Sequence, residues 1–128
     1  MSVVLDASAV LAYLRDEPGA HVVGAAIGAW VDDAAAAPLV SMVNWIEIAE
    51  RVDAPGVLEE LGLVLERVPL DLEVAAIAAA LRPPTRALGL SLADRACLGL
   101  ARARGWPALT ADRAWAQADV GVDVRLVR

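Results

Sequence analysis

Four acidic residues stand where an element of the predicted structure begins, ends or changes face: Asp6, Glu47, Asp94 and Asp112. Asp6 directly follows the apolar run at residues 3–5, which predicts a buried strand. Carboxylate oxygens are the ligands that hard divalent cations such as Mg²⁺ and Mn²⁺ prefer in proteins. A cation held by carboxylates activates water and stabilises charge on a phosphoryl oxygen, so these residue types point to phosphodiester hydrolysis.

The residue types that the chain lacks narrow the possible chemistry. All eleven basic residues are arginine, which excludes a Schiff-base lysine and the lysine of a phosphate-binding loop. His21 is the single histidine, and we expect it at the surface, so a pair of histidines cannot serve as acid and base. Cys97 is the single cysteine and no C-x-x-C motif occurs, which argues against a zinc site. If the protein is an enzyme, carboxylates and a bound ion carry its chemistry.

Taken singly, each acid also has a purely structural explanation. Asp6 or Ser8 could cap the helix that follows the first strand, because both side chains accept hydrogen bonds from the free N–H groups of a helix start. Residues 91–94, with the sequence S-L-A-D, match a capping box in which Asp94 replaces the usual Glu or Gln. Both explanations stay open at this stage.

The other two acids have similar alternatives. Glu47 and Arg51 are four residues apart in a predicted helix, a spacing that allows a weak ion pair. Asp112 could cap the short helix that contains Trp115.

The elements that must position these acids alternate between strand and helix along the whole chain. Strands are predicted at residues 3–5, near 39–40, at 108–110 and in the alternating segment 121–128, with a short strand or turn around 67–70. A helix is predicted over residues 8–15, another is halted by Pro83 and Pro84, and a long one is opened by Ser91 and closed by Gly105. This order predicts a single α/β domain over residues 1–128, with a central parallel sheet of about four to five short strands and helices on both faces.

Parallel strands bring their carboxyl ends to one edge of the sheet. Asp6 and Asp112 each follow a predicted strand, and the helix that carries Asp94 would begin at the same edge. Glu47 lies one to two turns into a helix that leaves this edge. Two carboxylates 4 Å apart repel by about 4 kcal/mol at an effective dielectric constant near 20. Such a cluster is therefore typical of a site that binds a divalent cation.

Composition and charge set further limits. No stretch approaches the roughly 18 unbroken apolar residues that a membrane span needs, and the N-terminus lacks the basic segment of a signal peptide. The lone cysteine fits a reducing compartment, so we expect a cytoplasmic protein without a membrane partner. The formal net charge of −6 is unusual for a nucleic-acid-binding protein. Six arginines in the C-terminal half could form a local basic rim: Arg82, Arg86, Arg95, Arg102, Arg104 and Arg113.

Four segments of the chain, in order, resemble the signature segments of the PIN-domain ribonucleases: VVLDASAVLAYLRDEPG, SMVNWIEIAERV, LGLSLADRACLGLARARG and ALTADRAWAQ. They are most similar to the small single-domain toxins of VapBC toxin–antitoxin pairs. The resemblance runs from Val3 to about Gln117 and includes one acid in each segment.

The resemblance implies a fold, a reaction and partners. It implies an endoribonuclease that cleaves RNA such as transfer or ribosomal RNA with Mg²⁺ or Mn²⁺, a homodimer, and a small VapB-like antitoxin whose tail occupies the active site. A non-catalytic binding module that keeps the fold is the alternative. The matching acids are Asp6, Glu47, Asp94 and Asp112, the matching hydroxyl positions are Ser8 and Thr110, and Asp119 is a possible extra acid.

The amount of apolar sequence also suggests an interface. Trp30 and Trp45 lie on early helices, and 59% of the residues are hydrophobic. We expect part of this apolar surface to form a homodimer contact or an antitoxin groove, because large exposed apolar patches usually mark interfaces.

Overall fold

The computed structural model describes residues 1–128, and its centre is a five-stranded parallel sheet. The strands lie in the order β3-β2-β1-β4-β5, so the first strand of the chain is the middle strand of the sheet. Every neighbouring pair is parallel, with Val4 of β1 opposite both Leu39 and Ala108. The strands are β1 (Val4–Leu5), β2 (Leu39–Ser41), β3 (Glu66–Val68), β4 (Ala108–Thr110) and β5 (Val124–Leu126).

Side chains alternate between the two faces of the sheet and build two hydrophobic cores. Val4 and Ala108 belong to one core, whereas their chain neighbours Leu5 and Leu109 belong to the other. Both faces of the central strands are therefore covered, as expected for a parallel sheet. Cys97 is fully buried in the first of these cores.

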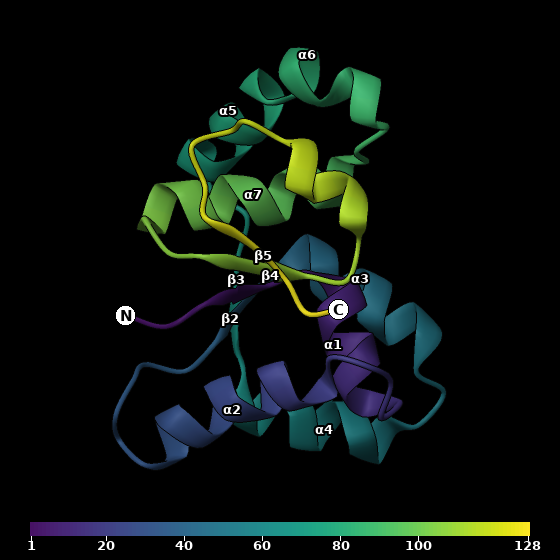
Figure 1. Ribbon diagram of the computed structural model, residues 1–128. Helices are drawn as coiled ribbons and strands as arrows, with labels where there is room; N and C mark the ends of the chain where they lie inside the picture. The colour runs from purple at the N-terminus through teal and green to yellow at the C-terminus, as the bar shows by residue number, and fades with distance from the viewer.

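Helices cover both faces, and α5, α6 and α7 lie on the opposite side of the sheet from α2 and α4 (Figure 1). Buried residues of α1 and α3 join the core on the side of α2 and α4. The helices are α1 (Ala7–Leu14), α2 (Ala20–Val31), α3 (Met42–Arg51), α4 (Pro55–Val64), α5 (Leu72–Ala80), α6 (Arg82–Thr85) and α7 (Leu92–Arg104), with 3₁₀ turns η1 (Arg86–Leu88) and η2 (Arg113–Gln117).

This architecture confirms the predicted fold class, and several local details differ from the expectation. Neither Asp6 nor Ser8 caps α1, because no side chain there accepts from the free N–H groups of the helix start. Helix α5 ends at Ala80, just before Pro83 and Pro84, as predicted, but the two prolines also stand in the first turn of a separate short helix, α6, where a missing N–H costs nothing. The long helix α7 is capped by Ser91 and ends at Gly105, as predicted.

Positions of the aromatic and apolar side chains complete the fold. Trp115 is fully buried, whereas Trp30 and Trp45 are only half-buried. His21 is exposed, as expected. None of the helices has both the length and the apolar character needed to traverse a lipid bilayer.

Candidate active site

A cavity of about 260 Å³ lies where the chain leaves the carboxyl ends of β1 and β4 and where α7 begins. It brings together all four acids that the sequence singled out. Its lining residues are Asp6, Ala7, Ser8, Leu11, Glu47, Arg51, Asp94 and Asp112. The four acids thus lie together at one edge of the sheet, as the sequence predicts. Asp119, the possible extra acid, is not among the lining residues.

Asp6 is the most buried of the four acids, with only 3% of its surface exposed. One carboxylate oxygen, Oδ2, accepts hydrogen bonds from the hydroxyls of Ser8 at 2.6 Å and Thr110 at 2.9 Å. The other oxygen, Oδ1, is buried without a hydrogen-bond partner. An orphaned buried carboxylate oxygen is costly unless a cation or a protein donor meets it. The hydroxyls thus fix the carboxylate and leave Oδ1 available.

Burial raises the pKa of Asp6 from its ordinary value of 3.8 to about 6. The hydrogen bonds from Ser8 and Thr110 act in the opposite direction, because they stabilise the charged form. The negative charges of Asp94 and Glu47 add to the increase, which places both of these acids within electrostatic reach of Asp6.

Thr110 and Ser8 also tie the loop after β4 to this carboxylate. The backbone N–H of Ala111 donates to Ser8 Oγ at 2.9 Å, and that of Asp112 donates to Thr110 Oγ1 at 3.0 Å. The two hydroxyl positions therefore support both Asp6 and the segment that carries Asp112.

Asp94 is the acid at the third helical position of a complete capping box, whose N-cap residue is Ser91. Its Oδ2 accepts from the backbone N–H of Ser91 at 2.8 Å, and its own N–H donates to Ser91 Oγ at 3.1 Å. The structural explanation of Asp94 is therefore correct, but it uses only one carboxylate oxygen. Oδ1 makes no hydrogen bond.

Asp112 repeats this arrangement at the start of η2. Its Oδ1 accepts from the backbone N–H of Ala114 at 3.0 Å, which confirms that it caps the short helix containing Trp115. Asp112 is exposed, and its Oδ2 makes no hydrogen bond. Each of the three aspartates in the cavity thus has one oxygen held by a protein donor and one without a partner.

Glu47 is positioned through a residue that the sequence analysis missed. Asn44, one turn earlier on α3, is fully buried, and its Nδ2 donates to Glu47 Oε2 at 3.5 Å and to the carbonyl of Ala93 at 3.1 Å. Its Oδ1 accepts from Ser41 Oγ at 2.7 Å. The sequence signal for this role is an asparagine in an amphipathic helix, three residues before the acid Glu47.

The predicted ion pair between Glu47 and Arg51 is absent. Arg51 lines the cavity, but no carboxylate oxygen lies within 4.0 Å of its guanidinium, since the two ion pairs of the chain join Arg125 to Asp123 and Arg128 to Glu17. Weak exposed pairs of this kind lose side-chain entropy when they form.

The six arginines expected to form a basic rim do not gather at this cavity, since none of them is among its lining residues. Arg95 donates to the carbonyl of Ala78 at 2.8 Å, and its Nε is buried without a partner. Arg102 and Arg104 lie in the last turn of α7. Asp94 and Arg104 are ten residues apart in this helix, about 15 Å along its axis.

The donor set of the cavity fits a hard divalent cation. Its ligating atoms are carboxylate and hydroxyl oxygens, and three aspartates each present an oxygen without a protein donor. As they stand, no three His, Cys, Asp or Glu side chains are close enough together to hold a metal ion. A cation shared by three of these acids therefore requires some of their side chains to change rotamer.

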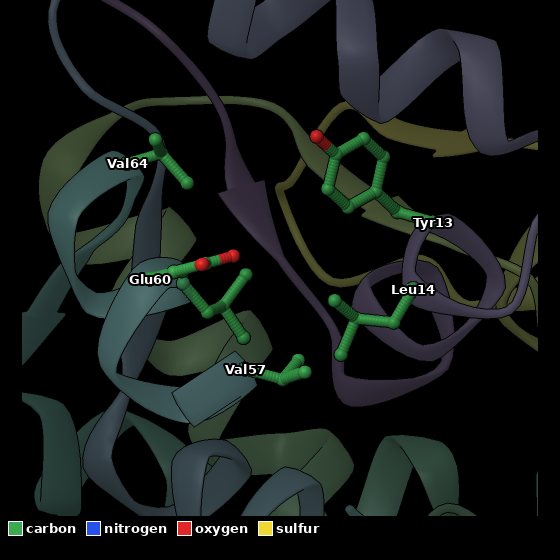
Figure 2. Close-up of a pocket in the computed structure, with 6 residues that line it drawn as sticks. Tyr13, Leu14, Val57, Glu60 and Val64 are labelled. Carbon is green, nitrogen blue, oxygen red and sulfur yellow. The ribbon is translucent and has the colours of Figure 1, made fainter. Parts of the chain in front are cut away.

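A second concavity, of about 350 Å³, lies between α1 and α4, and five of its six lining residues are hydrophobic. Figure 2 shows Tyr13 and Leu14 of α1 across from Val57, Glu60 and Val64 of α4. Leu11 of the same helix α1 lines the acidic cavity. The apolar groove and the acidic cavity thus both include residues of α1.

Residues 3–121 match the family model described as the PIN domain. No curated protein matches the chain in sequence. The matched range contains all four acids of the cavity and every strand except β5.

Several solved structures share the fold at low sequence identity. A DNA-bound VapBC from Salmonella typhimurium is 17% identical, with a TM-score of 0.74, over 100% of this chain and 99% of that one. A toxin–antitoxin complex from Klebsiella pneumoniae is 14% identical, with a TM-score of 0.72, over 99% and 98%. FitAcB from Neisseria gonorrhoeae is 24% identical, with a TM-score of 0.67, over 95% of each chain.

Proposed function

The chain belongs to the PIN-domain family, and we propose that it is a metal-dependent endoribonuclease that acts as the toxin of a toxin–antitoxin pair. Its reaction is the hydrolysis of phosphodiester bonds in RNA, with structured RNA such as transfer or ribosomal RNA as the substrate class. The similarity in fold to the VapBC and FitAcB structures agrees with this proposal.

The observation that carries the proposal is the hydrogen bonding of the two carboxylate oxygens of Asp6. A carboxylate with one oxygen fixed by two hydroxyls and the other buried without a partner faces a cavity that contains three more acids. No hydrogen bond within the protein explains that second oxygen, whereas a divalent cation would satisfy it and offset the repulsion among the acids.

Each residue of the cavity has a defined part in this proposal. Asp6, Asp94 and Asp112 would hold Mg²⁺ or Mn²⁺ through their unpartnered oxygens, and Glu47 would contribute to the same site or orient the attacking water. Ser8 and Thr110 hold the Asp6 carboxylate in place. The bound cation supplies activation of water and charge stabilisation on a phosphoryl oxygen.

The apolar groove between α1 and α4 is the surface proposed for the antitoxin. Both surfaces include residues of α1, so the proposed partner segment has an apolar helical face followed by basic residues. The cavity lining carries four acids and a single arginine, which favours a basic end of such a segment. The homodimer implied by the sequence resemblance stays a prediction, checked by light scattering.

Cleavage of RNA in the presence and absence of metal tests the proposal. The purified protein is incubated with total bacterial RNA in Mg²⁺ or Mn²⁺, and the new RNA ends are mapped by sequencing. We expect discrete cuts that stop in EDTA and in the Asp6→Asn variant, which keeps the size of the side chain. Undiminished cutting in EDTA would contradict the metal mechanism. No cutting and no Mn²⁺-dependent rise in melting temperature would favour the non-catalytic binding module.

A further inference from the structure

Arg51 is the only cationic side chain that lines the acidic cavity. It is the last residue of α3, one helical turn beyond Glu47, and it is exposed to solvent. Four acids and one arginine give the lining a formal charge of −3 when all are ionised. A guanidinium surrounded by this negative charge is expected to form an ion pair with one of the carboxylates.

Arg51 pairs with none of these acids. No carboxylate oxygen lies within 4.0 Å of it, and it makes no side-chain hydrogen bond, although Glu47 stands at the favourable spacing. The five N–H donors of the Arg51 guanidinium are therefore free at the acidic cavity.

An RNA backbone needs a positive group at this place. Even with one divalent cation bound, four ionised acids would leave the cavity negative, which opposes the approach of a phosphate. A guanidinium presents a planar fork that binds two phosphate oxygens together, and it stays charged at every relevant pH.

The residue types of the cavity lining favour contact with the RNA backbone over contact with its bases. It contains no aromatic side chain and no amide, the groups on which proteins stack unpaired bases and read their edges. We propose that Arg51 binds a backbone phosphate of the substrate RNA next to the scissile bond and so holds the strand against the acids. This inference rests on the proposed ribonuclease function.

The test compares Arg51→Met with Arg51→Lys and with a matched control, Arg104→Met. Arg104 is exposed and lies at the other end of α7 from Asp94. The substrate is a short RNA spanning the strongest cut site found in total RNA, and kcat/KM is measured in Mn²⁺ over a range of salt concentrations. The Mn²⁺-dependent rise in melting temperature is recorded for each protein as a measure of metal binding.

Arg51→Met should lower kcat/KM about tenfold or more at every cut site, because it removes charge-assisted hydrogen bonds. The slope of log kcat/KM against log salt should become shallower by about 0.7, as expected when one contact to a single-stranded phosphate is lost. Arg51→Lys should keep the slope and recover only part of the rate, since it keeps the charge without the fork. Arg104→Met should change kcat/KM less than twofold at 0.15 M salt, because its distance exceeds the screening length of about 8 Å.

Each other outcome overturns the inference in a recognisable way. A wild-type rate and salt slope in Arg51→Met would show that Arg51 does not contact the strand. Altered cut-site preference with an unchanged slope would show that it contacts a base. A loss of the Mn²⁺-dependent shift would show that it acts on the acids. Failure of the wild-type protein to cleave any RNA in Mn²⁺ would instead remove the proposed function.

Discussion

The side-chain amide of Asn44 donates to the backbone carbonyl of Ala93 at 3.1 Å, which joins α3 to the first turn of α7. The same Nδ2 reaches Glu47 at 3.5 Å, and the residue after Ala93 is Asp94. Asn44 is fully buried, so its hydrogen bonds form away from water. One amide thus sets the relative position of two of the four acids.

Replacing Asn44 by leucine, a residue of similar size, should therefore affect both stability and the site. We expect a loss of about 1–3 kcal/mol in unfolding free energy, because the carbonyl of Ala93 and the hydroxyl of Ser41 lose a buried partner. We also expect a smaller Mn²⁺-dependent rise in melting temperature and slower RNA cleavage. Thermal melting with and without Mn²⁺ and a cleavage assay measure these effects.

Thr85→Val is the matched control for this change. Thr85 is also fully buried, its hydroxyl donates to the carbonyl of Leu81 at 2.7 Å, and it is not among the residues that line the acidic cavity. It should lose stability without losing the Mn²⁺ response. If Asn44→Leu behaves in the same way, Asn44 serves only to hold the two helices together.

The double use of Asp94 gives a second prediction. Asp94→Ala should lower the unfolding free energy in EDTA by about 0.5–2 kcal/mol, because the cap on the Ser91 N–H is lost, and it should also abolish cleavage and reduce the Mn²⁺ shift. Ser91→Ala removes the other half of the capping box and leaves the carboxylate. It should lose similar stability and still cleave RNA. Cleavage by Asp94→Ala at the wild-type rate would mean that Asp94 is only a cap.

The raised pKa of Asp6 predicts how stability depends on pH in the absence of metal. Between pH 3.8 and about 6 the folded protein keeps the Asp6 proton while the unfolded chain has lost it, so the unfolding free energy falls as pH rises. The change from 3.8 to about 6 corresponds to about 3 kcal/mol, present in full below pH 3.8 and lost above pH 6.

Urea unfolding of the wild type and of Asp6→Asn in EDTA, from pH 4 to 7.5, measures this effect. The difference between the two proteins should shift in favour of the variant as pH rises, because the variant cannot titrate. A difference that is constant over this range would contradict the raised pKa. With Mn²⁺ present, the stabilisation of the wild type should weaken below about pH 6, because protons and metal compete for the same carboxylate.

The sequence was sufficient to predict the sheet edge where the acids meet. Asp6 and Asp112 follow apolar strands, and Ser91 with Gly105 marks the ends of α7 by ordinary capping rules. These signals are local, and the parallel order of the strands then places the acids together without any knowledge of side-chain contacts.

Contacts across the chain could not be read in this way. The hydroxyl of Thr110 reaches Asp6 from 104 residues away, and Asn44 meets Ala93 across 49 residues, so neither pair leaves a sequence pattern. The helix caps show a different limit. A helix cap and a metal ligand are alternative interpretations of Asp94 and Asp112 in the sequence, but the two roles are compatible. In the structure only one carboxylate oxygen of each residue accepts a capping hydrogen bond, and the other oxygen has no partner.

Val127, near the C-terminal end of the chain, lies between the turn at Gly19 and Thr110, whose hydroxyl holds Asp6. Gly19 has a φ of +95°, and a Cβ at this position would collide with the carbonyl of Val127. The N–H of Val127 donates to the carbonyl of Thr110 at 2.9 Å, beside the hydroxyl that holds Asp6.

Gly19→Ala should therefore lower the unfolding free energy by about 2 kcal/mol or more, from the strained backbone and the displaced Val127. Gly28→Ala is the matched control, because Gly28 lies inside α2 with no atom within 4 Å of an added Cβ. It should raise the unfolding free energy by about 0.5–1 kcal/mol, since alanine favours a helix. Urea unfolding of both variants distinguishes these opposite signs. Equal stability of Gly19→Ala and the wild type would mean that Val127 is not held against this turn, and that the C-terminal segment does not brace Thr110.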